Sequence, residues 1–241
     1  KLVKGGYLLT DDERELLGKV TNHFDKVVVL LDAGNIMDMS WVEEYGDKLS
    51  AVLYLWQGGM ESGNAVADVL SGKVNPSGHL TDTIARNYAD YPSSKDFGKR
   101  KFNNYREDVY VGYRYFSTFD EGAVIYPFGY GLSYTTFDTN GDFTFDGKNV
   151  RLNVTVKNTG DREGKEVAQV YVEAPQGKLG KPLRSLVAFA KTDDIPAGEE
   201  STLNLTFNLD DVVSYDDKGH TGYKSCYIAE VGEYKVYLGD N

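Results

Sequence analysis

Lys26-Val-Val-Val-Leu-Leu31 and Ala51-Val-Leu-Tyr-Leu-Trp56 are the two stretches that decide the fold of the first half of the chain. Both are apolar runs without polar alternation, a pattern typical of strands covered on both faces in a parallel sheet. The segment between them is long enough for a crossover connection, and Ser40 to Tyr45 can form a short helix within it. The sequence therefore predicts a β-α-β unit whose two strands are parallel neighbours.

Helical patterns lie on both sides of this unit. Thr10 is followed three residues later by a glutamate, which is the spacing of a capping box, and apolar residues then recur at helical intervals. This predicts a helix from about Asp11 to Asn22. A second helix is predicted from Gly63 to Leu70, where glycine and proline follow as stop signals.

The second half of the chain has a different hydrophobic period. From residue 150 to 157, and again from 203 to 209, apolar residues alternate with polar ones, as in strands with one buried face. Further strands are expected near 167–173, 185–191 and 234–238. The spacing predicts an antiparallel β-sandwich from Asn140 to Asn241 with these residues inside: Leu152, Val154, Leu205 and Phe207. The polar stretch 138–142 reads as a linker before it, and residues 107–116 as an aromatic, β-rich segment.

Composition excludes several classes of function. The chain has 241 residues, which suits two domains, and its formal charge of −11 repels phosphate backbones and anionic membrane surfaces. Nucleic acid and membrane are therefore not expected partners. A single cysteine, Cys226, excludes an internal disulfide and a thiolate zinc cluster, and it favours the cytoplasm slightly over secretion. The three histidines lack metal-ligand spacing, so no metal or cofactor is predicted.

The best candidate for a binding site follows the second apolar run. Gln57-Gly-Gly-Met-Glu-Ser-Gly-Asn64 joins a predicted strand to a predicted helix, and ligands of α/β sheets bind at the carboxyl ends of strands. Asp32 ends the first strand at the same edge. Gln57, Glu61 and Asp32 are therefore candidate ligand contacts, although a structural tight turn for the segment 57–64, and a helix cap or solvation for Asp32, are the commoner roles of such residues.

Two further features bear on carbohydrate chemistry. Tyr105 opens an aromatic-rich stretch whose rings could stack on sugars, although core packing is the commoner use of such residues. Glycosidases use two facing carboxyl groups, and this chain has several adjacent acidic pairs. Neighbours along a strand or helix point apart, however, so these pairs are interpreted as solvated faces, and no catalytic residue is assigned in this chain.

Four stretches of the sequence carry a family resemblance. Glu61-Ser-Gly-Asn-Ala-Val-Ala-Asp-Val-Leu-Ser-Gly-Lys-Val-Asn-Pro-Ser-Gly-His-Leu80 resembles a stretch of the α/β sandwich domain of family 3 glycoside hydrolases, and residues 107–116 and 126–137 resemble the two motifs that follow it. The last third, with Val154-Thr-Val-Lys-Asn-Thr-Gly160, is similar to the fibronectin-III-like domain of the β-glucosidases in this family. The resemblance implies domains at 1–138 and 139–241, the first without its N-terminal portion.

The resemblance also implies a function. The active site of the family combines an aspartate nucleophile on a (β/α)₈ barrel with an acid/base glutamate on a loop of the sandwich domain, and neither position is present here. The expectation is an accessory part of a retaining β-glucosidase acting on cello-oligosaccharides, inactive alone, whose partners are the barrel and a β-glucoside substrate. A β-xylosidase part and a stand-alone carbohydrate- or protein-binding module are the alternatives.

Overall fold

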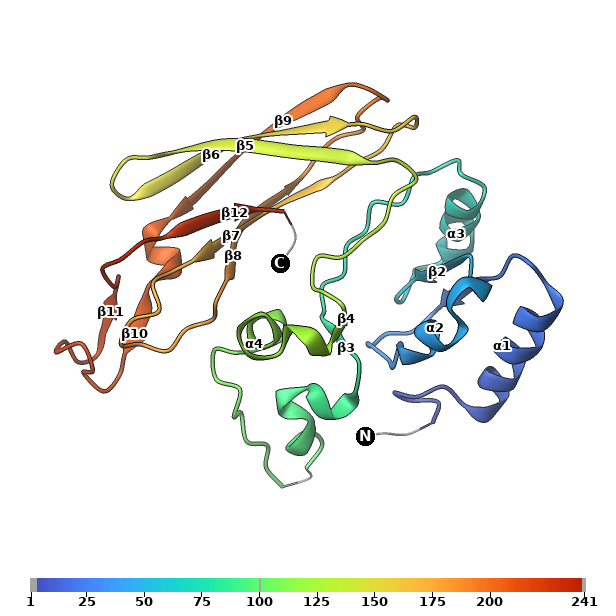
Figure 1. Ribbon diagram of the computed structural model, residues 1–241, viewed down its shortest axis with the longest axis horizontal. Helices are drawn as coiled ribbons and strands as arrows, with labels where there is room; N and C mark the ends of the chain where they lie inside the picture. The colour runs from blue at the N-terminus through green and yellow to red at the C-terminus, as the bar shows by residue number, and fades with distance from the viewer. Residues whose placement is uncertain (1–3, 100, 240–241) are drawn as a thin grey trace. The chain divides into compact units, whose positions relative to one another are not determined.

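The computed structural model describes residues 4–99 and 101–239, which form two compact units. Unit 1 comprises the residues up to 73 together with 82–108 and 122–127, and unit 2 comprises 74–81, 109–121 and the residues from 128 onward. Figure 1 colours the chain from its N-terminus in blue to its C-terminus in red. These units are defined by packing, so the single domain boundary expected after residue 138 stays a prediction. No helix in the described ranges is both long and apolar enough to cross a membrane.

The central element of unit 1 is the predicted parallel strand pair. Strand β1 (Val28–Leu31) pairs with β2 (Ala51–Tyr54) in parallel, in a register that runs from Val28 opposite Ala51 to Leu31 opposite Tyr54. The connection contains the expected short helix α2 (Ser40–Tyr45), followed by the 3₁₀ turn η1 (Gly46–Lys48). The prediction of neighbouring parallel strands is confirmed.

The expectation that β1 is covered on both faces is wrong for the described residues. Leu31 is buried, but Val28 and Leu30 remain 45% and 42% exposed. Successive side chains of a strand point to opposite faces, so one face of the sheet packs inward while the other is open at these two positions. The continuous apolar run shows that both faces of β1 carry apolar side chains. It does not show whether this chain supplies the layers that would cover both faces.

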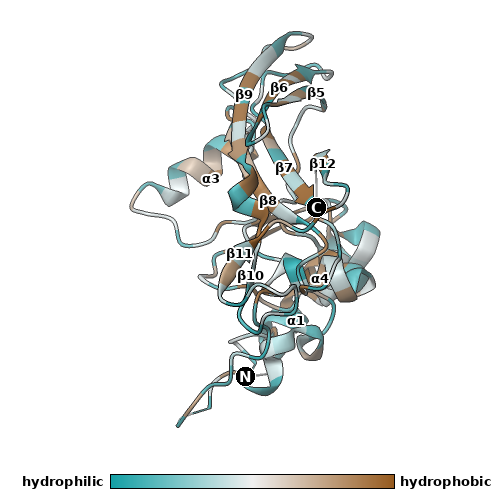
Figure 2. Cartoon of the chain, turned by 90° about the vertical axis from the view of Figure 1, so that its left-hand side faces the viewer, coloured by the Kyte–Doolittle hydropathy of each residue, from teal (hydrophilic) through white to brown (hydrophobic). Residues whose placement is uncertain are grey.

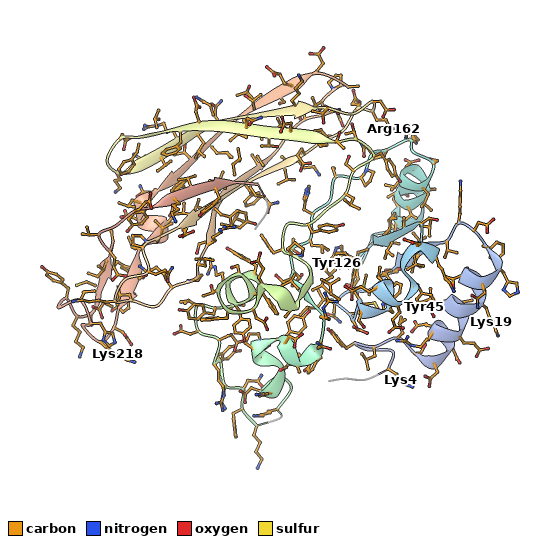
Figure 3. All side chains as sticks on the ribbon, viewed as in Figure 1. Lys4, Lys19, Tyr45, Tyr126, Arg162 and Lys218 are labelled. Atoms are coloured by element: carbon orange, nitrogen blue, oxygen red, sulfur yellow. The ribbon has the colours of Figure 1, made fainter. Side chains whose placement is uncertain are left out.

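The helices of unit 1 begin where the local sequence signals place them. Helix α1 (Asp11–His23) has the complete capping box, in which Glu13 N donates to the Thr10 hydroxyl and Thr10 N donates to the Glu13 carboxylate. Helix α3 (Ser62–Leu70) follows β2. Tyr45, labelled in Figure 3, donates its hydroxyl to the Arg14 carbonyl at 3.2 Å and so connects α2 with α1.

Buried apolar residues of unit 1 lie in α2 and in a second small sheet. Trp41 is fully buried and donates its indole N–H to the Asp38 carbonyl at 2.8 Å, which satisfies the polar end of the ring. Strand β3 (Ile84–Ala85), with both residues buried, pairs antiparallel with β4 (Val124–Tyr126). Between β3 and β4 lie the 3₁₀ turns η2 (Tyr88–Asp90), η3 (Pro92–Lys95) and η4 (Glu121–Ala123).

Unit 2 is an antiparallel sandwich of two three-stranded sheets, as the period-two pattern predicts. One sheet has the order β5-β6-β9 and the other β12-β7-β8. Their bounds are β5 Phe137–Phe145, β6 Asn149–Asn158, β7 Val167–Glu173, β8 Ser185–Lys191, β9 Glu200–Asn208 and β12 Lys235–Leu238. Figure 2 shows the alternation as brown and pale bands along β9. Leu152, Val154, Leu205 and Phe207 all lie in the buried core, which confirms that prediction.

Two expectations for the middle of the chain are wrong. Residues 138–142 are not a linker but part of β5, which pairs with β6 along its whole length. Their polar side chains are tolerated because β5 is an edge strand whose stability comes from backbone pairing. The aromatic segment 107–116 does not form a strand, since its second half enters helix α4 (Tyr113–Phe119), which buries Phe116. Tertiary burial there overrides the β-propensity of aromatic residues.

The end of unit 2 carries a small hairpin that belongs to neither sheet. After the 3₁₀ turn η5 (Leu209–Val212), strand β10 (Ser214–Asp216) pairs antiparallel with β11 (Cys226–Ile228). The loop between them contains Lys218, which is labelled in Figure 3.

Candidate functional site

The carboxyl ends of β1 and β2 lie side by side and bring two loops together. Leu55 N donates to the Leu31 carbonyl at 2.8 Å, so the pairing continues one residue past β2. Beyond this point the loop after β1 passes directly against the loop after β2. A Cβ atom at Gly34 would lie 2.7 Å from the Gln57 side-chain nitrogen, so a larger residue there would require the Gln57 side chain to move.

An aromatic pair stands at the same edge. The rings of Tyr54 and Trp56 are tilted against each other with centroids 4.5 Å apart, and the Tyr54 hydroxyl donates to the Asn35 carbonyl of the neighbouring loop. Burial raises the pKa of the Tyr54 phenol above its usual value. Trp56 has a φ of 55°, in the left-handed region that bulky residues rarely occupy. Such strain is often retained at binding sites.

The turn into α3 is equally tight. A Cβ at Gly58 would lie 2.2 Å from the Ser62 hydroxyl oxygen, so the turn requires glycine there. The Glu61 carboxylate accepts a hydrogen bond from the Asn64 side chain in the first turn of the helix. Glu61 is therefore held close to the helix start, with its remaining acceptor positions directed to solvent.

The structure brings together three of the four residues singled out from the sequence. Asp32, Gln57 and Glu61 all belong to the two loops at this edge, and all three are exposed. Tyr105 belongs to a different segment, the long loop between η3 and α4, where it is 86% exposed. We call the edge formed by residues 32–35 and 55–61 the strand-edge site. Whether these residues contact a ligand stays a prediction.

Sequence reasoning missed two features. The apolar run predicts Trp56 as the last residue of a buried strand, although its place immediately before Gln57-Gly-Gly is a signal for the turn in which it lies. The second is Asp96, which anchors the long polar loop: its carboxylate pairs with Lys99 at 2.5 Å and Arg106 at 2.7 Å and is almost fully buried. Hydrogen bonding from Lys99, with the charge of Arg106, holds the pKa of Asp96 below its usual range.

The strand-edge site is suited to binding rather than to bond cleavage by its own groups. It offers two carboxylates, two primary amides and an indole ring, which hydrogen-bond to and stack on neutral polar ligands. Within the described residues there is no group of three or more His, Cys, Asp or Glu side chains able to hold a metal ion.

Comparison with known proteins agrees with the two halves of the sequence. Residues 4–134 match the family model of the glycosyl hydrolase family 3 C-terminal domain, and residues 166–241 match the fibronectin type III-like domain. The first match alone covers more than half of the chain.

Relatives of known name support the same family. The chain is 48% identical to a β-glucosidase of Ruminococcus albus over 237 residues, which is 98% of this chain but 25% of that protein. It is 42% identical to β-glucosidase A of Butyrivibrio fibrisolvens, covering 98% of this chain and 30% of the relative. The chain thus spans about a quarter to a third of the length of these curated relatives.

Solved structures resemble the whole chain. A β-glucosidase from Paenibacillus barengoltzii superimposes with a TM-score of 0.97 at 49% identity, covering 100% of this chain and 27% of that one. β-Glucosidase 3B of Thermotoga neapolitana, solved in complex with glucose, gives 0.89 at 42% identity and covers 99% and 33%. From its family match, its relatives and its fold, this chain belongs to glycosyl hydrolase family 3, through the C-terminal domain of that family and the fibronectin type III-like domain that follows.

Proposed function

We propose that this chain is an accessory part of a retaining β-glucosidase that removes terminal β-D-glucosyl residues from cello-oligosaccharides. The observation that carries the proposal is the match of the entire chain, at 49% identity, to about a quarter of a solved β-glucosidase. The named relatives quoted above are β-glucosidases, which favours glucosides over xylosides. In this proposal residues 1–138 are the α/β sandwich domain and 139–241 the fibronectin-III-like domain, which accords with the ranges of the two family matches.

The catalytic carboxyl groups lie outside this chain in our proposal. Retaining glycosidases need two carboxyl groups about 5 Å apart, facing each other across one anomeric carbon. Asp32 and Glu61 are the carboxylates of the strand-edge site, and both are exposed, with Glu61 engaged by Asn64 at the start of α3. A (β/α)₈ barrel and an acid/base loop, in the same polypeptide or on a second chain, supply the chemistry.

The exposed apolar face of β1 supports the proposal that another part of the enzyme covers this sheet. Val28 and Leu30 leave two apolar side chains side by side on one sheet face, and parallel sheets are normally covered on both faces. The remainder of the enzyme is the natural occupant of that face. The strand-edge site then contributes contacts to the substrate or to the barrel, through Asp32, Gln57 and Glu61, and the long loop contributes Tyr105.

The test compares this chain with the complete enzyme. The 241-residue protein and the full reading frame are purified and assayed with nitrophenyl β-glucoside and nitrophenyl β-xyloside. We expect no turnover by the chain alone, and turnover of the glucoside in preference to the xyloside by the full protein. Turnover by the chain alone that disappears in Asp32→Asn or Glu61→Gln would refute the assignment. A full-length protein that binds sugars without hydrolysing either substrate would favour a binding module.

A further inference from the structure

The β10–β11 hairpin of unit 2 is small and separate from the two three-stranded sheets. Each strand has three residues, and within the described ranges the pair forms a two-stranded sheet of its own. An isolated two-stranded hairpin is at best marginally stable in water. Something other than sheet pairing must therefore hold it.

A single buried carboxylate holds the hairpin loop. Asp216 is fully buried, and its oxygens accept hydrogen bonds from the backbone N–H groups of Gly219, His220 and Thr221 at 2.7–2.9 Å. The Thr221 hydroxyl adds a fourth hydrogen bond, and Ser225 N donates to the Asp216 carbonyl. Burial alone would raise the pKa of Asp216, but these hydrogen bonds lower it below its usual range. The backbone of the loop is thus fixed by hydrogen bonds to the Asp216 carboxylate.

The same loop contains a residue with a strained backbone conformation. Ser225 has a φ of 60°, a conformation that non-glycine residues seldom adopt, and it directly precedes β11. Strained residues persist only where the surroundings fix them, and they concentrate at functional sites. Both observations indicate that the position of β11 relative to β10 is specified closely.

What this ordered hairpin presents to solvent is a group of tyrosines. Tyr215 lies directly opposite Tyr227 across the two strands, with ring centroids 5.1 Å apart, and the rings are 51% and 74% exposed. Tyr223, in the loop, is 67% exposed. Asp216 points inward and Tyr215 outward because successive strand residues alternate. We call Tyr215, Tyr223 and Tyr227 the tyrosine face.

We propose that the tyrosine face is a second carbohydrate-binding surface, remote in sequence from the strand-edge site, which stacks on the pyranose rings of a β-linked glucan. The choice of sugar rests on the proposed function. Tyrosine offers a flat apolar ring with a polar tip, which matches the apolar C–H face and the hydroxyl rim of a glucose unit. The two rings are inclined at 61° to each other, so a sugar ring that stacks on the exposed face of one tyrosine meets the other tyrosine at an angle.

The surroundings favour a neutral polymer over other ligands. The chain carries a net charge of −11, which disfavours nucleic acid and other polyanions. The loop itself contains both signs of charge, Asp217 beside Lys218, so it lacks the single-sign patch that would select a charged peptide. The preformed loop reduces the entropy lost on binding, which is the benefit of ordering an exposed segment in advance.

Affinity electrophoresis tests the proposal on the 241-residue chain. The protein is run in native gels containing soluble mixed-linkage β-glucan, with an α-linked dextran gel as the reference polymer. We expect retardation by the β-glucan and a loss of affinity of about tenfold or more in the Tyr215→Ala/Tyr227→Ala variant. Phe189→Ala, at another exposed aromatic of unit 2 that is 67% exposed, is the matched control and should bind like the wild type. Equal retardation of both variants, or none of the wild type, overturns the proposal.

A conservative variant separates stacking from damage to the fold. Tyr215→Phe/Tyr227→Phe keeps both rings and should keep most of the affinity, whereas loss equal to that of the alanine variant would show that stacking is not the interaction. Sedimentation velocity identifies a competing occupant: a wild-type dimer that the alanine variant abolishes, without glucan binding, would make this face a contact between copies and refute the proposal. Hydrolysis of nitrophenyl β-glucoside by the full-length enzyme tests the proposed function separately, since a short aryl glucoside has no chain to reach the tyrosine face.

Discussion

Replacing Asn158 should cost more stability than any other polar substitution on its strand. Asn158 ends β6, is completely buried, and uses its whole side chain. Its amide nitrogen donates to the carbonyls of Arg162 and Ile195 at 2.6 and 2.8 Å. Its oxygen accepts from the Thr135 hydroxyl at 2.7 Å and from Gly160 N at 3.1 Å.

The magnitude follows from this set of hydrogen bonds. Asn158→Ala removes four hydrogen bonds and leaves their partners without a replacement in a buried site. At about 1 kcal/mol for each bond, the loss is about 4 kcal/mol in the free energy of unfolding. That is a large fraction of the roughly 5–15 kcal/mol that stabilises a typical domain. The control Asn153→Ala changes an exposed residue of the same strand and should stay within about 0.5 kcal/mol of the wild type.

Asn158→Asp sharpens the test because its effect depends on pH. In the variant, a carboxylate oxygen replaces the amide nitrogen that donates to the carbonyls of Arg162 and Ile195. An ionised carboxylate would be repelled by these two carbonyl oxygens, so the folded state should raise the pKa of the new carboxyl group. A raised pKa in the folded state means that stability is greatest below the unfolded value of about 3.9 and is lost as pH rises through the folded value. The wild-type protein has no such contribution at this position.

Urea denaturation followed by two signals provides the assay. Both tryptophans, Trp41 and Trp56, lie in unit 1, so tryptophan fluorescence follows that unit, while the β-sheet signal in circular dichroism is dominated by the sandwich of unit 2. Asn158→Ala should lower the midpoint of the β-sheet signal. If its midpoint moves no further than that of Asn153→Ala, the hydrogen-bond argument is refuted.

The remaining predictions concern an ion pair, a loop anchor and a helix cap. Lys181 and Glu230 form a buried pair at 2.7 Å, so Lys181→Met should cost about 3–5 kcal/mol in urea denaturation, and a loss below 1 kcal/mol would contradict the burial argument. Burial alone would raise the pKa of Glu230, but Lys181 holds it below its usual range, so the contribution of the pair should disappear as pH falls below the usual carboxyl pKa of about 4.3. Asp96→Asn should make the loop 96–106 more sensitive to trypsin, and an unchanged digestion rate would show that the anchor does not order the loop. Thr10→Ala should cost about 1 kcal/mol and speed amide exchange in the first turn of α1, which hydrogen exchange measures against the unaffected α3.

The sequence alone determined the elements whose signals are local. The capping box at Thr10 depends on residues three apart, so it fixed the start of α1 without reference to the rest of the fold. The alternation in β6 and β9 reflects one buried face per strand, and it identified Leu152 and Phe207 as core residues before any sheet was known. The parallel pairing of β1 with β2 followed from a long connection between two apolar runs.

Tertiary structure alone decided the features that depend on residues distant in sequence. The edge strand β5 is polar, and only its backbone pairing with β6 makes it a strand rather than a linker. At the strand-edge site, the sequence placed Asp32 and Gln57 at neighbouring strand ends, but the close approach of Gly34 to Gln57 and the left-handed Trp56 arise from packing between two loops. The tyrosine face depends on the hydrogen bonds by which the backbone of the β10–β11 loop binds the Asp216 carboxylate. Such arrangements cannot be predicted from hydrophobic periodicity. The periodicity shows which face of a helix or strand is buried, but it does not show which distant residues pack against that face.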